Sequence, residues 1–167
     1  MVVREMSGEE CRGLVARVEY GRLATVHQDQ PYIVPIYFAY DREYLYGFTT
    51  PGRKVEWMRA NPLVCVEVDD VVSHFHWSSV VVLGHYEELS DTPTHRDVRL
   101  QAQVLLERRA LWWQTAYAAG QVRGGSHSAD ALFYRIHIDQ ITGRRATPDS
   151  VESAVGLSSA ARPAREK

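Results

Sequence analysis

The sequence has few cysteines and no long apolar segment. Its two cysteines, Cys11 and Cys65, occur among 167 residues, and neither belongs to a CxxC pair. This argues against a disulfide framework or a cysteine-ligated zinc site and suits a reducing compartment. No apolar run approaches the ~20 residues of a membrane-spanning helix, and the acidic start MVVREMSGEE lacks the apolar core of a signal peptide. We therefore expect a cytoplasmic protein with no membrane segment.

An excess of charge of one sign is also missing. The formal net charge is −2, so no global attraction to nucleic acid or to an anionic membrane is expected, and any anion site must be local. The chain contains no internal repeat and no GxSxG elbow or ordered triad around Ser79. Hydrolase chemistry is therefore unsupported.

What is present suits one folded domain. A chain of 167 residues, 45% of them hydrophobic, is long enough to bury a sizeable core. We expect that domain to span residues 1–146. From residue 147 to 167, Ser, Ala, Pro and charged residues dominate without a core-forming period, which predicts a disordered tail.

Three helices are predicted from their capping signals. Ser7 and Glu10 fit a capping box, and apolar residues at helical spacing follow it up to Gly21, where we expect this helix to end. A short helix over residues 53–60 stops before Asn61-Pro62. A longer one begins at Asp91-Thr92-Pro93 and extends toward residue 119, with a possible break near residue 111.

The rest of the chain reads mainly as β-strands. We expect strands over residues 22–26, 32–40, 44–49, 63–68, 76–88 and 131–138, the first three forming an antiparallel meander, and a turn over residues 139–145. Pro35 cannot donate to a ladder, so it implies a bulge, a bend or an unpaired edge. The predicted fold class is mainly β with helices (α+β), a closed or split antiparallel barrel of about six strands.

The segment FTTPGRKVEW, residues 48–57, has the composition of an anion site. A strand ends in Thr49 and Thr50, a Pro-Gly turn follows, and a helix then starts with Arg53 and Lys54. Unpaired N–H groups and partial positive charge collect at a helix N-terminus, and the two hydroxyls and two cations could add donors to a phosphate. The alternative is a solvated basic pair on an exposed helix.

Several motifs occur in a characteristic order. They are GRLAT, a Val-Pro strand, a Gly-Arg-Lys turn, a helix that ends in Asn-Pro, and WSSVVVLG. This ordered set, from Gly21 to Leu89, resembles the small pyridoxamine 5′-phosphate oxidase-related FMN-binding family, with weaker support from FYRIHIDQITGRRA.

The resemblance implies a split β-barrel of the FMN-binding type, a homodimer, and FMN in a groove at the dimer interface. It assigns the FMN phosphate to Arg53 and Lys54, and the strand end facing the phosphate and ribityl chain to Thr49 and Thr50. The strand beside the isoalloxazine ring would be Val34-Pro35-Ile36. The remaining residues that the resemblance places in the same groove are Trp77 and Ser79.

The function that the resemblance implies is that of an FMN-dependent oxidoreductase. It would act on a small-molecule substrate, with a reduced nicotinamide or another reductant as partner; the sequence does not identify the substrate. Two alternatives remain: a non-catalytic FMN- or haem-binding protein used for sensing or storage, and a deazaflavin-dependent reductase on the same barrel. The pyridoxamine oxidase reaction itself is disfavoured, because we find no match to its basic substrate-phosphate residues.

Two other groups of residues are candidates for function. His74 and His76 flank Phe75 and would share a strand face, but a metal site needs a third ligand and none is evident in the sequence. Either histidine could instead bind haem. Trp112 and Trp113 could pack in the core, contact a dimer partner or form a wall of the flavin pocket.

Overall fold

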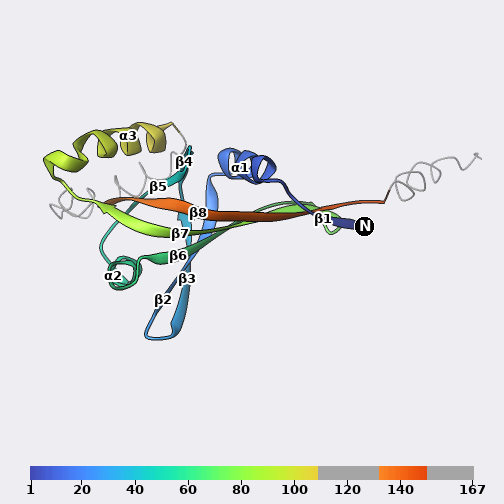
Figure 1. Ribbon diagram of the computed structural model, residues 1–167, viewed down its shortest axis with the longest axis horizontal. Helices are drawn as coiled ribbons and strands as arrows, with labels where there is room; N and C mark the ends of the chain where they lie inside the picture. The colour runs from blue at the N-terminus through green and yellow to red at the C-terminus, as the bar shows by residue number, and fades with distance from the viewer. Residues whose placement is uncertain (109–131, 150–167) are drawn as a thin grey trace, which may run out of the picture.

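The computed structural model describes residues 1–108 and 132–149, which form one antiparallel sheet with helices packed on it (Figure 1). The strands are β1 (Val2–Glu5), β2 (Tyr20–His27), β3 (Gln30–Tyr37), β4 (Ala39–Asp41), β5 (Tyr44–Thr49), β6 (Leu63–Ser73), β7 (His76–Leu89) and β8 (Leu132–Thr147). The helices are α1 (Gly8–Arg17), α2 (Arg53–Ala60) and α3 (Arg96–Glu107), with a 3-10 turn, η1 (Pro93–His95), before α3.

The strand order is β3-β2-β6-β7-β8-β5-β4, and β1 pairs with β8 off this path. Figure 1 shows β6, β7 and β8 running along the molecule, the β2–β3 hairpin projecting from them, α1 and α3 on one side and α2 on the other. The pairings within the described residues leave the sheet open between β3 and β4. The predicted α+β class, with an antiparallel sheet of the split-barrel type, is thereby confirmed.

Local signals placed the start of α1 and the whole of α2 correctly. In α1 the Ser7 hydroxyl accepts from the Glu10 N–H at 3.2 Å, and the Glu10 carboxylate accepts from the Ser7 N–H at 2.9 Å, so the predicted capping box is present. Helix α2 has the predicted bounds. However, α1 ends at Arg17, because residues 20–27, which include Gly21, form a strand paired with both β3 and β6.

The predicted meander is confirmed in part: β2 pairs with β3 and β4 pairs with β5, both antiparallel, but the middle run is not one strand. The run from residue 32 to 40 is divided at buried Phe38 into β3 and β4, and β5 pairs with β4 and β8 but not with β3. Pro35 does lie at an edge, since β3 is the end strand of the sheet order. Strand β5 therefore lies between its local hairpin partner β4 and the distant strand β8, which the sequence did not predict as its neighbour.

Other strands extend beyond the predicted limits. Strand β6 continues past Asp69 and Asp70, whose charges pair with Arg22 and Arg17. The predicted turn over residues 139–145 lies within β8, which has partners in both β7 and β1. Strand β1 was not predicted. Helix α3 begins only at Arg96, after η1, and both its expected continuation beyond residue 108 and the tail from residue 150 lie outside the described residues.

The core lies between the sheet, α1 and α2. Its fully buried members include Leu14 of α1, Leu23 of β2, Met58 of α2 and Ile136 of β8. A smaller cluster, Tyr46, Leu89 and Ala102, joins β5 and β7 to α3. In the described ranges, no helix combines the length and the apolar character needed to cross a membrane.

Candidate functional site

A cavity of ≈ 380 Å³ lies where the ends of β3 and β5 meet the start of α2. We call it the Lys54 cavity. Aromatic, apolar and hydroxyl side chains surround a single cationic group in its lining, which consists of Tyr20, Pro35, Ile36, Tyr37, Phe48, Thr49, Thr50, Lys54 and Tyr134. Five of the residues that the sequence predicted for the cofactor therefore lie on one cavity.

Lys54 is a half-buried cation with no anionic partner among the described residues. None of the carboxylates in the described residues forms an ion pair with it, and its Nζ lies 5.9 Å from the centroid of the Tyr134 ring. Burial lowers the pKa of its ammonium, because the apolar surroundings disfavour the charged form. An anionic ligand would compensate this charge.

Arg53 points in another direction from its neighbour. Its side chain is exposed, and its Cζ lies 5.7 Å from the centroid of the Tyr32 ring on β3. Adjacent helix positions are about 100° apart, so the two cations diverge at the first turn of α2. Arg53 stands beside the Lys54 cavity and does not line it.

The start of α2 adds backbone donors beside Lys54. Its N-cap residue, Gly52, provides no side-chain cap for the first turn. The Thr49 hydroxyl donates to the Thr50 carbonyl at 3.2 Å, and both threonines line the cavity. The N-terminal N–H groups of a helix carry partial positive charge, so this end of the cavity favours a negatively charged group.

Tyr134 is a cavity residue that the sequence did not reveal. It is 1% exposed, its hydroxyl has no hydrogen-bond partner among the described residues, and burial raises the pKa of that hydroxyl. A side-chain carbon at Gly47, on the neighbouring strand, would overlap the Tyr134 ring, so glycine is needed there. A polar ligand atom could satisfy this buried donor.

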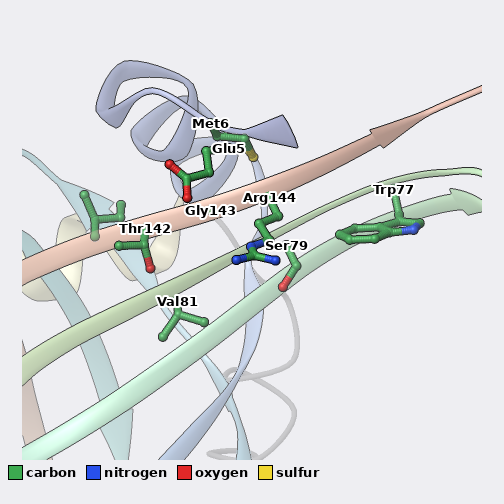
Figure 2. Close-up of a pocket in the computed structure, with 9 residues that line it drawn as sticks. Glu5, Met6, Trp77, Ser79, Val81, Thr142, Gly143 and Arg144 are labelled. Atoms are coloured by element: carbon green, nitrogen blue, oxygen red, sulfur yellow. The ribbon is translucent and has the colours of Figure 1, made fainter. Parts of the chain in front are cut away.

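A second cavity, of ≈ 530 Å³, holds two further predicted residues. We call it the Arg144 cavity. Figure 2 shows Arg144 and Ser79 in the middle of this surface, with the Trp77 indole on one side and Thr142 and Val81 on the other. Ser79 donates to the Glu67 carboxylate at 3.0 Å, and Arg144 takes part in no ion pair that joins two described residues. Arg144 was overlooked because its segment was read as a turn.

The nine predicted residues are thus distributed over several places. Pro35, Ile36, Thr49, Thr50 and Lys54 share one cavity, whereas Trp77 and Ser79 line the other; the two cavities share no lining residue. Val34 packs on the core, and Arg53 lies against Tyr32. Their part in cofactor binding remains a prediction.

The histidine and tryptophan candidates have different outcomes. His74 lies in the turn between β6 and β7, with its ring 4.9 Å from the Phe75 ring, and His76 begins β7, so they do not share a strand face as expected. Trp112 and Trp113 lie outside the described residues.

Known proteins are similar to this chain in both sequence and fold. A family model described as pyridoxamine 5′-phosphate oxidase matches residues 7–145. An uncharacterised protein from Rhizobium meliloti (strain 1021) is 41% identical over 146 residues, which cover 87% of this chain and 97% of that protein. The family model therefore spans all three helices and every described strand except β1 and the last two residues of β8.

Two solved structures describe the fold of relatives. The crystal structure of a FAD-binding protein from Mesorhizobium loti is 43% identical, with a TM-score of 0.74, and the match covers 88% of this chain and 100% of that one. A FAD-binding protein from Mycobacterium smegmatis is 24% identical with a TM-score of 0.63, covering 87% and 100%; this match concerns the fold alone.

Proposed function

The chain belongs to the pyridoxamine 5′-phosphate oxidase family, and from this premise we propose that it is a flavin-dependent oxidoreductase whose nucleotide binds in the Lys54 cavity. The observation that carries the proposal is the half-buried Lys54 ammonium, which has no carboxylate partner among the described residues. The FAD-binding protein from Mesorhizobium loti, at 43% identity, supports a flavin as the ligand.

The phosphate end of the flavin would lie at the start of α2. Lys54 would supply a charge, the Thr50 hydroxyl a donor and the uncapped first turn N–H groups. The Thr49 hydroxyl would donate as well once it turns away from the Thr50 carbonyl. Arg53 would join from the Tyr32 side by turning its guanidinium toward the cavity. FMN and FAD share this phosphate, and the proposal concerns the part common to both; the sequence predicts FMN.

The isoalloxazine end would meet an apolar wall. Pro35 and Ile36 line the cavity on the β3 side, Phe48 lines it on the β5 side, and no carboxylate is among the lining residues. The Tyr134 hydroxyl is available as a donor to the ligand. A bound flavin would supply hydride or electron transfer, while the chain positions it and shields it from water.

The proposed active form is a homodimer. The resemblance places Trp77 and Ser79 in the flavin groove, yet they line a different cavity from Lys54 within one chain. One flavin groove can contain Lys54, Trp77 and Ser79 together if a second copy of the chain contributes its Arg144 cavity to the groove. Large exposed apolar side chains support an interface between copies, among them Ile33, Leu63, Val71 and Val72, each more than 60% exposed.

The absorption spectrum of protein purified without added cofactor tests the proposal first. We expect a flavin spectrum, and titration of flavin-free protein should show binding of FMN, FAD or both. A colourless protein that binds neither would overturn the proposal, and a haem spectrum would favour the haem-binding alternative.

Anaerobic rapid mixing then tests the reaction. NADH, NADPH and reduced deazaflavin would each be mixed with the flavin-loaded protein, and we expect at least one to bleach the flavin faster than it bleaches free FMN. If none does, the chain is a non-catalytic flavin-binding protein. The substrate would be sought only after a donor has been identified.

A further inference from the structure

Away from both cavities, β7 and β8 bring two histidines and one aspartate together. His85 Nδ1 lies 3.0 Å from Asp139 Oδ2, and His137 Nδ1 lies 2.8 Å from Asp139 Oδ1. One ligand atom from each of the three residues lies within 4.8 Å of the others, and the two rings are 5.0 Å apart between centroids. None of the three lines the Lys54 or Arg144 cavity.

The strand pairing builds this cluster. His85 and His137 are direct cross-strand partners, and the register between β7 and β8 then shifts, from Gly84 opposite Ile138 to Leu83 opposite Gln140. Asp139 is the extra residue of this β-bulge, a feature that re-aims side chains. A side-chain carbon at Gly84 would overlap the His137 carbonyl oxygen, so only glycine allows β8 to approach this closely.

We propose that His85, His137 and Asp139 form a binding site for a divalent transition-metal ion of the Zn²⁺ class. The Nδ1 atoms of the two rings and the Asp139 carboxylate are its three protein ligands. Imidazole with carboxylate suits Zn²⁺ and its first-row neighbours, whereas Mg²⁺ and Ca²⁺ prefer oxygen alone. The three side chains are between 31% and 47% exposed, so water can complete the coordination.

The surroundings of His137 fit a metal ligand. Its Nε2 faces the Glu43 carboxylate at 3.9 Å, while its Nδ1 faces Asp139. Metal-bound histidines usually direct their other ring nitrogen toward a carboxylate or carbonyl, which fixes the tautomer and the ring orientation. The Tyr44 ring, 5.2 Å away and nearly edge-on, holds the imidazole in this orientation. The competing interpretation is that Asp139 only accepts a hydrogen bond from each ring.

Metal titration of the full-length chain decides between the two. The protein would carry no polyhistidine tag, would be stripped with a chelator, and would be titrated calorimetrically with Zn²⁺ and spectroscopically with Co²⁺. We expect one equivalent of each to bind, with no binding of Mg²⁺ at the same concentration. The absence of stoichiometric Zn²⁺ and Co²⁺ binding would overturn the proposal and leave a hydrogen-bonded cluster.

Variants then locate the ion. His85→Ala and His137→Ala should each weaken Zn²⁺ binding by at least about tenfold, the smallest loss usual even for a supporting contact. Asp139→Asn, which keeps an oxygen acceptor but removes the charge, should weaken it as well. His74→Ala/His76→Ala is the matched control, because this pair lies in the β6–β7 turn, and it should leave the affinity unchanged. Loss of binding in the control instead would place the ion at the turn and overturn the proposal.

Two measurements distinguish the loss of a metal ligand from a folding defect in the variants. Near-UV circular dichroism without metal should be the same for every variant, since all three side chains are partly exposed. Electron paramagnetic resonance of bound Cu²⁺ should show coupling to two nitrogens in the unaltered chain and to one in each single-histidine variant. An unchanged nitrogen count in both variants would contradict the assignment. None of these measurements requires bound flavin, so they test the metal site independently of the proposed function.

Discussion

At the scale of single residues, Lys54 is the clearest sign of a ligand. We expect Lys54→Met to weaken the binding of FMN or FAD by ~1.5–3 kcal/mol, the usual range for a hydrogen bond to a charged group, without unfolding the protein. Arg59→Met is the matched control, since Arg59 lies on the same helix but pairs with Glu88. Fluorescence titration of the flavin-free proteins gives the comparison, and equal affinities in the two variants would remove Lys54 from the phosphate site.

The lowered pKa of Lys54 also predicts a pH dependence of stability. At pH below the lowered value, the lysine is charged in both states and its burial destabilises the flavin-free fold. As the pH rises from there toward 10.5, the native state loses its proton first, so the free energy of unfolding should increase. Thermal melts of the unaltered chain minus those of Lys54→Met isolate this change. A difference that does not vary with pH would contradict the burial of the charge.

The Tyr134 hydroxyl predicts opposite effects on stability and affinity. An unsatisfied buried donor costs about 1–3 kcal/mol, so Tyr134→Phe should stabilise the flavin-free protein by up to that amount. It should also weaken flavin binding by ~0.5–1.5 kcal/mol if the hydroxyl donates to the ligand. Tyr86→Phe is the control with the opposite sign, because the Tyr86 hydroxyl donates to Glu88 at 3.0 Å. Chemical denaturation with and without flavin would show whether the two variants diverge in this way.

At the scale of elements, what could be predicted depended on how local the signals are. The capping box of α1, the whole of α2, and β7 to within one residue could be read from neighbouring residues. The end of β6 and the second half of β8 could not, because polar residues there resemble turns unless their distant strand partners are known.

The capping box predicts an acid-sensitive helix. Arg4, followed by the Ser7 N–H, holds the pKa of Glu10 down at about 2, against an ordinary value of 4.5. Its stabilising contribution is therefore complete above pH 4.5 and is lost as the pH falls from there to about 2. Glu10→Gln should remove this part of the acid transition in circular dichroism, whereas Glu9→Gln, in the same turn, should not. Ser7→Ala should lower stability by ~1 kcal/mol at neutral pH.

At the scale of the whole molecule, the sequence predicted five of the residues that line the Lys54 cavity and two that line the Arg144 cavity, but not that one chain separates these two sets. Thr49, Thr50 and Lys54 meet because a strand, a turn and a helix follow one another directly. Trp77 and Ser79 come from a different part of the sheet, and sequence order contains no information about where that surface lies. Tyr134, which lines the Lys54 cavity, comes from β8, whose partner strands are far away in the sequence.

The proposed homodimer predicts complementation between two defective variants. Lys54→Met and Trp77→Ala should each weaken flavin binding. If each groove combines Lys54 of one chain with the partner's Trp77, a mixed dimer has one groove with both changes and one with none. Unfolding the two variants together and refolding them should therefore restore tight binding at a fraction of the sites. Sedimentation equilibrium gives the oligomeric state, and a monomer, or no restoration in mixed dimers, would contradict the shared groove.

The position of strand β8 near the end of the described sequence determines when the Lys54 cavity can be completed during synthesis. This strand follows every other described element in the sequence, yet it pairs with β1, β5 and β7, and its residue Tyr134 lines the Lys54 cavity. Contacts that span almost the whole chain slow folding, because they close long loops. In a nascent chain the Lys54 cavity therefore lacks part of its lining until Tyr134 has emerged from the ribosome, so the complete cavity forms after the other strands have been synthesised.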